Sequence, residues 1–215
     1  KFIKDILTSD IYRYYWPEMV NIEETKREKW TESEISVDHP IRKAEAIRDP
    51  TVYTAGLTTS FTGLHFDIAV LDDVVVRENA YTEEGRSKVI AQYSLLASVE
   101  AGEAVEWVVG TRYHPLDLYN DMSSMQVDHF SEDGEVDNTE PLYEVFERQV
   151  ENRGDLTGEY LWPRQQRYDG KWFGFDSNIL AKKKAQYLDR LQFRAQYYND
   201  PNDPESAAIS RDLFQ

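Results

Sequence analysis

A strand–helix–strand pattern between residues 67 and 110 constrains the fold of this chain more than any other feature of its sequence. The run Asp67–Leu71 (DIAVL) is short and almost continuously apolar, which is typical of a strand covered on both faces in a parallel sheet. Thr82 can cap the helix that follows, two acidic residues suit its positive end, and Gly102 closes it. A second apolar strand, Glu106–Gly110 (EWVVG), completes the pattern. The pattern predicts an α/β fold with a right-handed crossover between parallel strands.

Shorter elements are predicted around this unit. An amphipathic helix opens the chain and ends at Trp16 and Pro17. A meander of three short strands is predicted next, at Glu34–Val37, Arg42–Ile47 and Thr51–Leu57. Further along, Thr139–Pro141 can start a helix that reaches Val150, and a long last helix is predicted from a Ser177 cap to about Tyr198.

The composition of the chain changes after about Met122. Residues 131–160 contain ten acidic side chains against two basic ones, which is a net charge of −8. An aromatic and glycine-containing stretch follows this acidic region. We therefore expect two parts, a core over residues 1–122 and a smaller, mainly helical subdomain over residues 123–215.

The acidic composition limits the partners that the chain can bind by itself. Lys and Arg number 24 against 40 Asp and Glu, which gives a formal net charge of −16. Binding along DNA requires clustered cations that neutralise phosphates. Any DNA contact must therefore come from a local basic strip or from segments outside this sequence, and no DNA-contacting residue can be assigned.

Other compositional features exclude several classes of site. The chain has no Cys, so disulfides and Cys–zinc sites are excluded, and its four His residues have no ligand spacing. No apolar run approaches the roughly 18 residues of a membrane span, so no membrane partner is expected.

An acidic pair follows the first predicted strand directly. Asp72 and Asp73 would be delivered to the carboxyl edge of the sheet, where α/β folds bind ligands. In a nucleotide hydrolase, one such carboxylate holds Mg²⁺ and its neighbour orients the attacking water. The pattern predicts Asp72 as the metal ligand and Asp73 as the catalytic base. The alternative interpretation is that polar residues follow a strand simply because the chain returns to water.

A second polar group follows the next predicted strand. Thr111 and Arg112 come directly after Gly110, so a parallel arrangement would bring them beside the acidic pair. A threonine hydroxyl there can hydrogen-bond the γ-phosphate or its water, and Arg112 can meet phosphate charge in a nucleotide-binding role. An ordinary polar turn is the alternative.

These residues resemble the ATPase domain of large terminase subunits, the DNA-packaging motors of tailed phages. The resemblance covers residues 56–119 most strongly, including the segments Gly63–Asp73 (GLHFDIAVLDD) and Trp107–His114 (WVVGTRYH). The opening helix, which ends in Trp16, Pro17 and Glu18, and the segment Gln196–Pro201 (QYYNDP) are similar to the family more loosely.

The resemblance implies roles for three of the residues. Asp72 matches the Walker B acid that binds magnesium, and Asp73 matches the catalytic acid, which is often Glu in such motors. Thr111 matches the coupling motif that links hydrolysis to movement of the lid and of DNA. The implied fold is a P-loop NTPase-like core of the RecA/ASCE type with a mainly parallel sheet, incomplete at the N-terminus, followed by a small helical lid from about Ser123.

The resemblance also implies cofactors and partners. Mg²⁺ and ATP are the expected cofactors of the full-length protein. Its expected partners are double-stranded DNA, the portal protein, the small terminase subunit and further copies of itself in a ring, with the host cytoplasm as the expected location. The function implied is ATP hydrolysis coupled to translocation of double-stranded DNA into a procapsid.

The sequence departs from the family in one important respect. It contains no Walker A loop of the form G-x-x-x-x-G-K-[ST], which cradles phosphates through backbone N–H groups and a lysine. In the family this loop lies upstream of the opening helix, and a nuclease domain follows the segment matched here. We therefore expect that this chain alone neither hydrolyses ATP nor cuts DNA.

Two other functions remain open from the sequence. Asp72 and Asp73 could be ligands in a two-metal nuclease, although no further acid stands out as a third ligand. The chain could also be a non-enzymatic structural or adaptor module in which residues 131–160 form a solvated acidic face.

Overall fold

A computed structural model of the chain describes residues 1–57, 59 and 63–202. These residues divide into two compact units, which are considered separately below. The first consists of Lys1–Ala69 and Gln92–Glu106, and the second consists of Val70–Ala91 and the chain from Trp107 onward. The division at residue 122 that the composition suggests stays a prediction.

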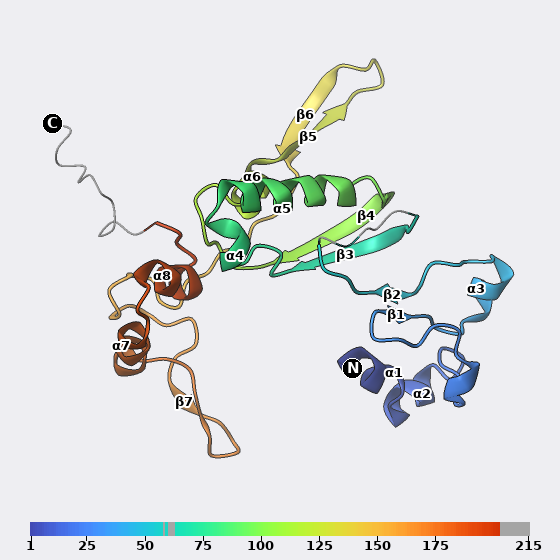
Figure 1. Ribbon diagram of the computed structural model, residues 1–215, viewed down its shortest axis with the longest axis horizontal. Coiled ribbons are helices and arrows are strands. Elements are labelled where there is room, and N and C mark those ends of the chain that lie inside the picture. Colours follow the sequence, from blue (N-terminus) through green and yellow to red (C-terminus); the bar gives the residue numbers. More distant parts are fainter. Residues whose placement is uncertain (58, 60–62, 203–215) are drawn as a thin grey trace. The chain divides into compact units, whose positions relative to one another are not determined.

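Short helices and strands make up both units (Figure 1). The helices are α1 (Phe2–Leu7), α2 (Asp10–Tyr15), the 3₁₀ turn η1 (Glu24–Lys26), α3 (Pro40–Ala44), α4 (Arg77–Ala80), α5 (Glu83–Leu96), α6 (Leu118–Ser124), α7 (Ser177–Gln186) and α8 (Arg190–Tyr198). The strands are β1 (Glu34–Ile35), β2 (Val52–Tyr53), β3 (Phe66–Asp72), β4 (Glu100–Val109), β5 (Gln126–Phe130), β6 (Val136–Pro141), β7 (Gln165–Gln166) and β8 (Trp172–Phe173). Over the described ranges, no helix has the length and apolar character needed to cross a membrane.

The strands form four separate two-stranded pairs, so the predicted RecA/ASCE-type core with a mainly parallel sheet is wrong. The pairs β1–β2, β5–β6 and β7–β8 are antiparallel. The β3–β4 pair differs, because the Asp73 amide donates to the Val109 carbonyl over 2.9 Å and brings the carboxyl ends of both strands together. The predicted strand–helix–strand unit is therefore present, but among the described residues no further strand extends it into a sheet.

The burial of β3 shows why the prediction of a strand covered on both faces is wrong. Ala69 and Leu71 are buried, whereas Ile68 and Val70 are about three-fifths exposed. On β4, Trp107 and Val109 are equally exposed. Covered parallel strands carry apolar residues on both faces, and DIAVL has that composition, but one face of this pair faces solvent.

Three predicted elements have a different form because local capping signals outweigh apolar periodicity. The first half of the predicted strand Arg42–Ile47 belongs to α3 instead, a helix that has Pro40 in its first turn after His39 and ends at Ala44. The opening helix is interrupted where the Ser9 hydroxyl accepts from the Tyr12 amide and starts α2. The last helix is likewise broken, because the Asp189 carboxylate caps α8 by accepting from the Gln192 amide.

The helix predicted to start at Thr139–Pro141 is also wrong. These residues end β6, whose partner β5 pairs Gln126 with Pro141 and Val127 with Glu140. Across the strands, the Thr139 hydroxyl donates to the Asp128 carboxylate over 2.6 Å. Cross-strand pairing of this kind stabilises the hairpin, and it competes with a helix that would have had a proline in its first turn.

The second unit is held by a small aromatic core near the C-terminal helices. Val150, Leu180, Phe193 and Tyr198 are buried together, and further aromatic residues pack against them. Phe193 stacks on Tyr197 with ring centroids 4.8 Å apart. Contacts between aromatic rings stabilise a core beyond the contribution of the apolar area that they bury. They therefore help two short helices to form a stable core.

Glu151 lies at the edge of this core with only 1% of its surface exposed. Its carboxylate accepts hydrogen bonds from the Tyr198 hydroxyl (2.6 Å) and from the backbone amides of Arg153 (2.7 Å), Leu156 (3.2 Å) and Gly158 (3.2 Å). Burial opposes the charged form, but these donors outweigh it and hold the pKa of Glu151 below its usual range. Burial, followed by the hydrogen bond to Glu151 and the charge of that carboxylate, raises the pKa of the Tyr198 phenol.

Replacing Glu151 with Gln is expected to lower the free energy of unfolding of the second unit by about 1.5–3 kcal/mol, because a charged acceptor of several hydrogen bonds is lost. A carboxyl whose pKa is depressed on folding contributes stability above its unfolded pKa, about 4.3, and loses it as pH falls through the folded value. The wild-type chain should therefore lose stability in acid more steeply than the Glu151→Gln variant. Denaturant unfolding between pH 7 and pH 3 measures this, and the exposed Glu144→Gln is the control.

Candidate functional site

The candidate site lies where β3 and β4 end side by side. Asp72 is the last residue of β3 and is exposed on the same face as Val70. Asp73 follows it, and Thr111 and Arg112 follow β4 after Gly110. The hydrogen bond from the Asp73 amide to the Val109 carbonyl places the acidic pair beside the start of the segment that carries Thr111. The structure thus brings together the two strand ends that the sequence singled out.

Asp73 has an unusual backbone conformation with φ of 46°. Residues other than glycine rarely adopt this left-handed region, although Asp and Asn tolerate it best. Such conformations cluster at functional sites, where the surrounding structure holds them in place. The turn redirects the chain immediately after Asp72, so the two neighbouring carboxylates do not continue the alternation of the strand.

Gly110 allows the segment after β4 to return over the strand ends. A Cβ atom at Gly110 would lie 2.0 Å from the hydroxyl oxygen of Tyr119 and 2.3 Å from its ring. The same hydroxyl lies 3.4 Å from the Val75 amide, which it accepts from, and 3.5 Å from the Val109 carbonyl. Tyr119, on α6, therefore joins the residues that follow β3 to the end of β4.

The segment between β4 and α6 is organised by the buried carboxylate of Asp117, which is 0% exposed. One oxygen accepts from the Tyr113 amide (3.0 Å) and the His114 amide (3.1 Å), and the other accepts from the Asn120 amide (3.1 Å). Asp117 is thus both the cap of α6 and the anchor of the turn that presents Thr111.

The Arg112 guanidinium is occupied by the same anchor. Its Nε lies 3.4 Å from the Asp117 carboxylate, and its terminal nitrogen lies 3.3 Å from the Asn120 side-chain oxygen and 3.4 Å from the Pro115 carbonyl. The side chain is 23% exposed. Arg112 therefore has an evident structural contact in this arrangement, and its predicted role in nucleotide binding stays a prediction.

Helix α8 connects to both strand ends. At its start, Arg77 of α4 lies 3.4 Å from the Asp189 carboxylate and donates to the Gln192 side chain. At its end, the Asn199 side chain accepts from the Arg112 amide over 2.8 Å. Gln196 contacts the Tyr113 hydroxyl between them. Helix α8 and its capping residues therefore contact both the segment that follows Asp73 and the segment that follows Thr111.

Burial shifts the pKa values of Tyr113, His114 and Tyr119 in the direction that favours their neutral forms. Burial, followed by the nearby charge of Asp73, raises the pKa of Tyr113, and burial, again with Asp73, raises the pKa of Tyr119 to about 12. Burial and then the charge of Arg86 lower the pKa of His114. A neutral His114 agrees with its Nδ1 accepting from the Leu116 amide over 3.0 Å.

The donor set fits a magnesium ion only with help from a ligand. No group of three or more His, Asp or Glu side chains that could hold a metal is found in the ranges 1–57, 59 and 63–202. Magnesium, however, is usually held by one or two carboxylates together with waters and substrate phosphates. Asp72 and Asp73, both exposed carboxylates at one strand end, are the residues that fit this description.

Sequence reasoning assigned no role in the site to three residues that shape it. Asp117, Tyr119 and Asn199 hold the two strand ends, and each bonds across at least three residues. For Asp117 a signal was present, since an Asp before an apolar residue and a helix is a typical cap. Asn199 lies in the segment Gln196–Pro201 that resembles the family, but no signal in the sequence pointed to its partner Arg112, which lies 87 residues away.

No protein-family model matches the chain, and no curated protein matches it.

Replacing Gly110 with Ala is expected to displace Tyr119, because the new methyl group would occupy the position of the phenol. We expect a loss of about 1–3 kcal/mol in the free energy of unfolding. Hydrogen exchange of residues 110–124 should also accelerate. Gly102→Ala, on β4 itself, is the control, because a Cβ there meets nothing within 4 Å. Equal effects of the two variants would contradict the packing described here.

Replacing Asp117 with Asn is expected to cost about 3 kcal/mol, because an amide nitrogen would face backbone donors and Arg112 would lose its partner. The first measurable change should be faster hydrogen exchange at the Tyr113 and His114 amides. Asp121→Asn, one turn along α6, removes the same charge without these contacts and should leave both amides protected.

Proposed function

We propose that this chain supplies part of the nucleotide-hydrolysis site of a viral DNA-packaging motor, a large terminase subunit. The observation that carries the proposal is the acidic pair Asp72–Asp73 at the end of β3, hydrogen-bonded through the Asp73 backbone to the end of the neighbouring strand that leads to Thr111. The resemblance of residues 56–119 to the ATPase domain of large terminase subunits supports the same function.

Each residue has a distinct part in the proposed chemistry. Asp72 would hold a magnesium ion, which when bound neutralises phosphate charge, and Asp73 would accept the proton of the attacking water. The φ of 46° at Asp73 turns its carboxylate away from the strand alternation that governs Asp72, which suits two different roles for adjacent acids. Thr111 would hydrogen-bond the reacting water or the terminal phosphate.

The contacts of α8 support a coupling role for the C-terminal helices. An ion pair links the start of α8 to Arg77 after β3, and a hydrogen bond links its end to Arg112 after β4. A change in the separation of the strand ends would therefore act on both ends of this helix. A motor requires such a link between hydrolysis and movement, and α8 meets this requirement with short-range contacts.

In this proposal, the phosphates of ATP are bound by residues that are not part of this sequence. The 215-residue sequence contains no Walker A motif, whose loop binds the phosphates in such motors through backbone amides and a lysine. The 215-residue chain alone is therefore expected to show no ATP turnover, whereas the intact protein should hydrolyse ATP when magnesium is present.

In the intact protein, Asp73→Asn is expected to lower kcat for ATP by about 10²–10⁴-fold, the usual contribution of a general base. Asp72→Asn should raise the magnesium concentration needed for half-maximal activity, because a metal ligand has lost its charge. Steady-state ATPase assays with magnesium titration measure both effects. The matched control is Asp67→Asn, an exposed carboxylate near the start of the same strand.

Wild-type turnover in a double Asp72→Asn, Asp73→Asn variant would exclude the proposed site. Manganese-dependent cleavage of plasmid DNA by the 215-residue chain, lost in the same variant, would instead assign the acidic pair to a nuclease.

A further inference from the structure

Positive charge is concentrated in one part of this acidic chain. Residues 161–198 contain eight Lys and Arg against three Asp and Glu, a net charge of +5, whereas the whole chain carries −16. This segment holds the β7–β8 hairpin and the helices α7 and α8. A polyanion that approaches the chain would therefore be attracted to this segment and repelled by the rest.

The hairpin at the start of this segment is a narrow, well-defined ribbon. Gln165 pairs with Phe173 and Gln166 with Trp172, and the turn between them is closed by the Gly170 amide donating to the Arg167 carbonyl over 2.9 Å. The base is equally fixed, since a Cβ at Gly174 would lie 2.3 Å from the Pro163 carbonyl oxygen. The ribbon therefore has a defined shape before any partner binds.

The cations of the hairpin are exposed and come from both of its arms. Arg164 precedes β7, and Arg167 and Lys171 flank the turn. Among the residues that the structure describes, no acidic side chain forms an ion pair with any of the three. The single acid of the turn, Asp169, is engaged locally, because its carboxylate accepts from the Lys171 amide over 3.1 Å.

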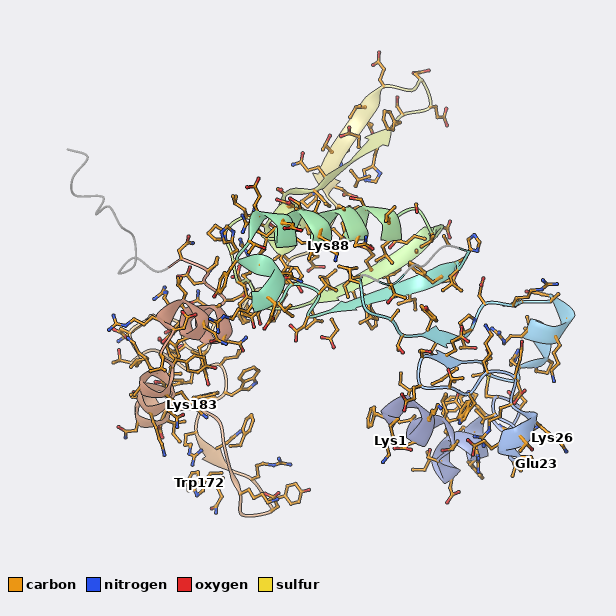
Figure 2. The ribbon with its side chains drawn as sticks, viewed as in Figure 1. Lys1, Glu23, Lys26, Lys88, Trp172 and Lys183 are labelled. Carbon is orange, nitrogen blue, oxygen red and sulfur yellow. The ribbon has the colours of Figure 1, made fainter. Side chains whose placement is uncertain are left out.

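Aromatic rings accompany these cations. The Arg164 guanidinium lies 5.1 Å from the centre of the Trp172 ring, which supports it from one side and leaves the other side exposed. Trp172 is 59% exposed, and Tyr168 at the turn is 99% exposed. Figure 2 shows Trp172 on the hairpin and Lys183 on α7, which adds further exposed cations next in the sequence.

We propose that the β7–β8 hairpin, residues 162–173, is a binding site for double-stranded DNA. A two-stranded ribbon has the width that the major groove admits, and exposed cations on both of its arms can reach phosphates that border the groove. The guanidinium of Arg164, which lies over the Trp172 ring, can make a bidentate contact with a phosphate. The inference rests on the proposed function and names its DNA contact. Its test uses no nucleotide, so the DNA-binding site and the hydrolysis site can be disproved independently of each other.

The test measures binding of the 215-residue chain to a fluorescein-labelled duplex of about 30 base pairs by anisotropy, at about 50 and 200 mM KCl. The variant Arg164→Gln, Arg167→Gln, Lys171→Gln is expected to weaken binding at least about tenfold at the lower salt concentration. The slope of log affinity against log salt should also fall by about 2–3, because each neutralised phosphate contributes about 0.9.

The matched control removes the same total charge elsewhere. Lys26→Gln, Lys43→Gln, Lys88→Gln also lowers the net charge by three at exposed positions outside the segment. It should bind the duplex within about twofold of wild type. Equal losses in the two triple variants, or no binding of the duplex by the wild-type chain at low salt, overturn the proposal. Unchanged thermal unfolding of both variants is required, and the exposure of all six side chains makes it expected.

A further arm distinguishes duplex from single-stranded DNA of the same sequence. If unpaired bases were the ligand, the single strand would bind more tightly than the duplex, and Tyr168→Ala would weaken it at least about fivefold through loss of stacking. That result overturns the assignment to double-stranded DNA. Tyr14→Ala, at a tyrosine that is 80% exposed on α2, is the control.

Discussion

The arrangement of the candidate site depends on one buried carboxylate. Asp117 accepts three backbone hydrogen bonds and faces Arg112, and it has no exposed surface. A buried charge is tolerated only when its lone pairs are satisfied, and the turn from Tyr113 to Asn120 has the shape that satisfies them. The same turn brings Tyr119 against Gly110 and so links the segments that follow both strands. Together with the hydrogen bond from the Asp73 amide to the Val109 carbonyl, this turn fixes the course of the segment that follows Thr111.

The β3–β4 pair is the part of the fold on which the proposed chemistry rests, and it is a small one. Its carboxyl ends meet through the Asp73 amide and the Val109 carbonyl, but Ile68, Val70 and Trp107 remain exposed on one face. Parallel strands are normally covered on both faces, so this pair has apolar surface that the described residues do not cover. The acidic pair and the basic hairpin are separate features of the chain, and a packaging motor would use both, one for hydrolysis and one for contact with DNA.

Much of the local structure could be predicted, and the errors have physical causes. The strand ends at Asp72 and Gly110 follow from apolar runs that stop at polar residues. Predictions failed where a capping residue competed with periodicity, as at Ser9 and Asp189, each of which starts a new helix inside a predicted one. The hairpin that replaced the helix at Thr139 forms because the pairing partner lies at Asp128, and a periodicity argument considers only neighbours along the chain.

The sequence by itself determined the order of strand, helix and strand, the position of two carboxylates after the first strand, and the segregation of charge that makes residues 161–198 basic. These properties depend on residues close together in the chain, so local rules can detect them. Only the tertiary structure decided that β3 and β4 are not part of a larger sheet, that Arg112 faces Asp117, and that α8 joins both strand ends. These properties depend on which groups separated in sequence satisfy each other's hydrogen bonds, and folding alone selects those partners.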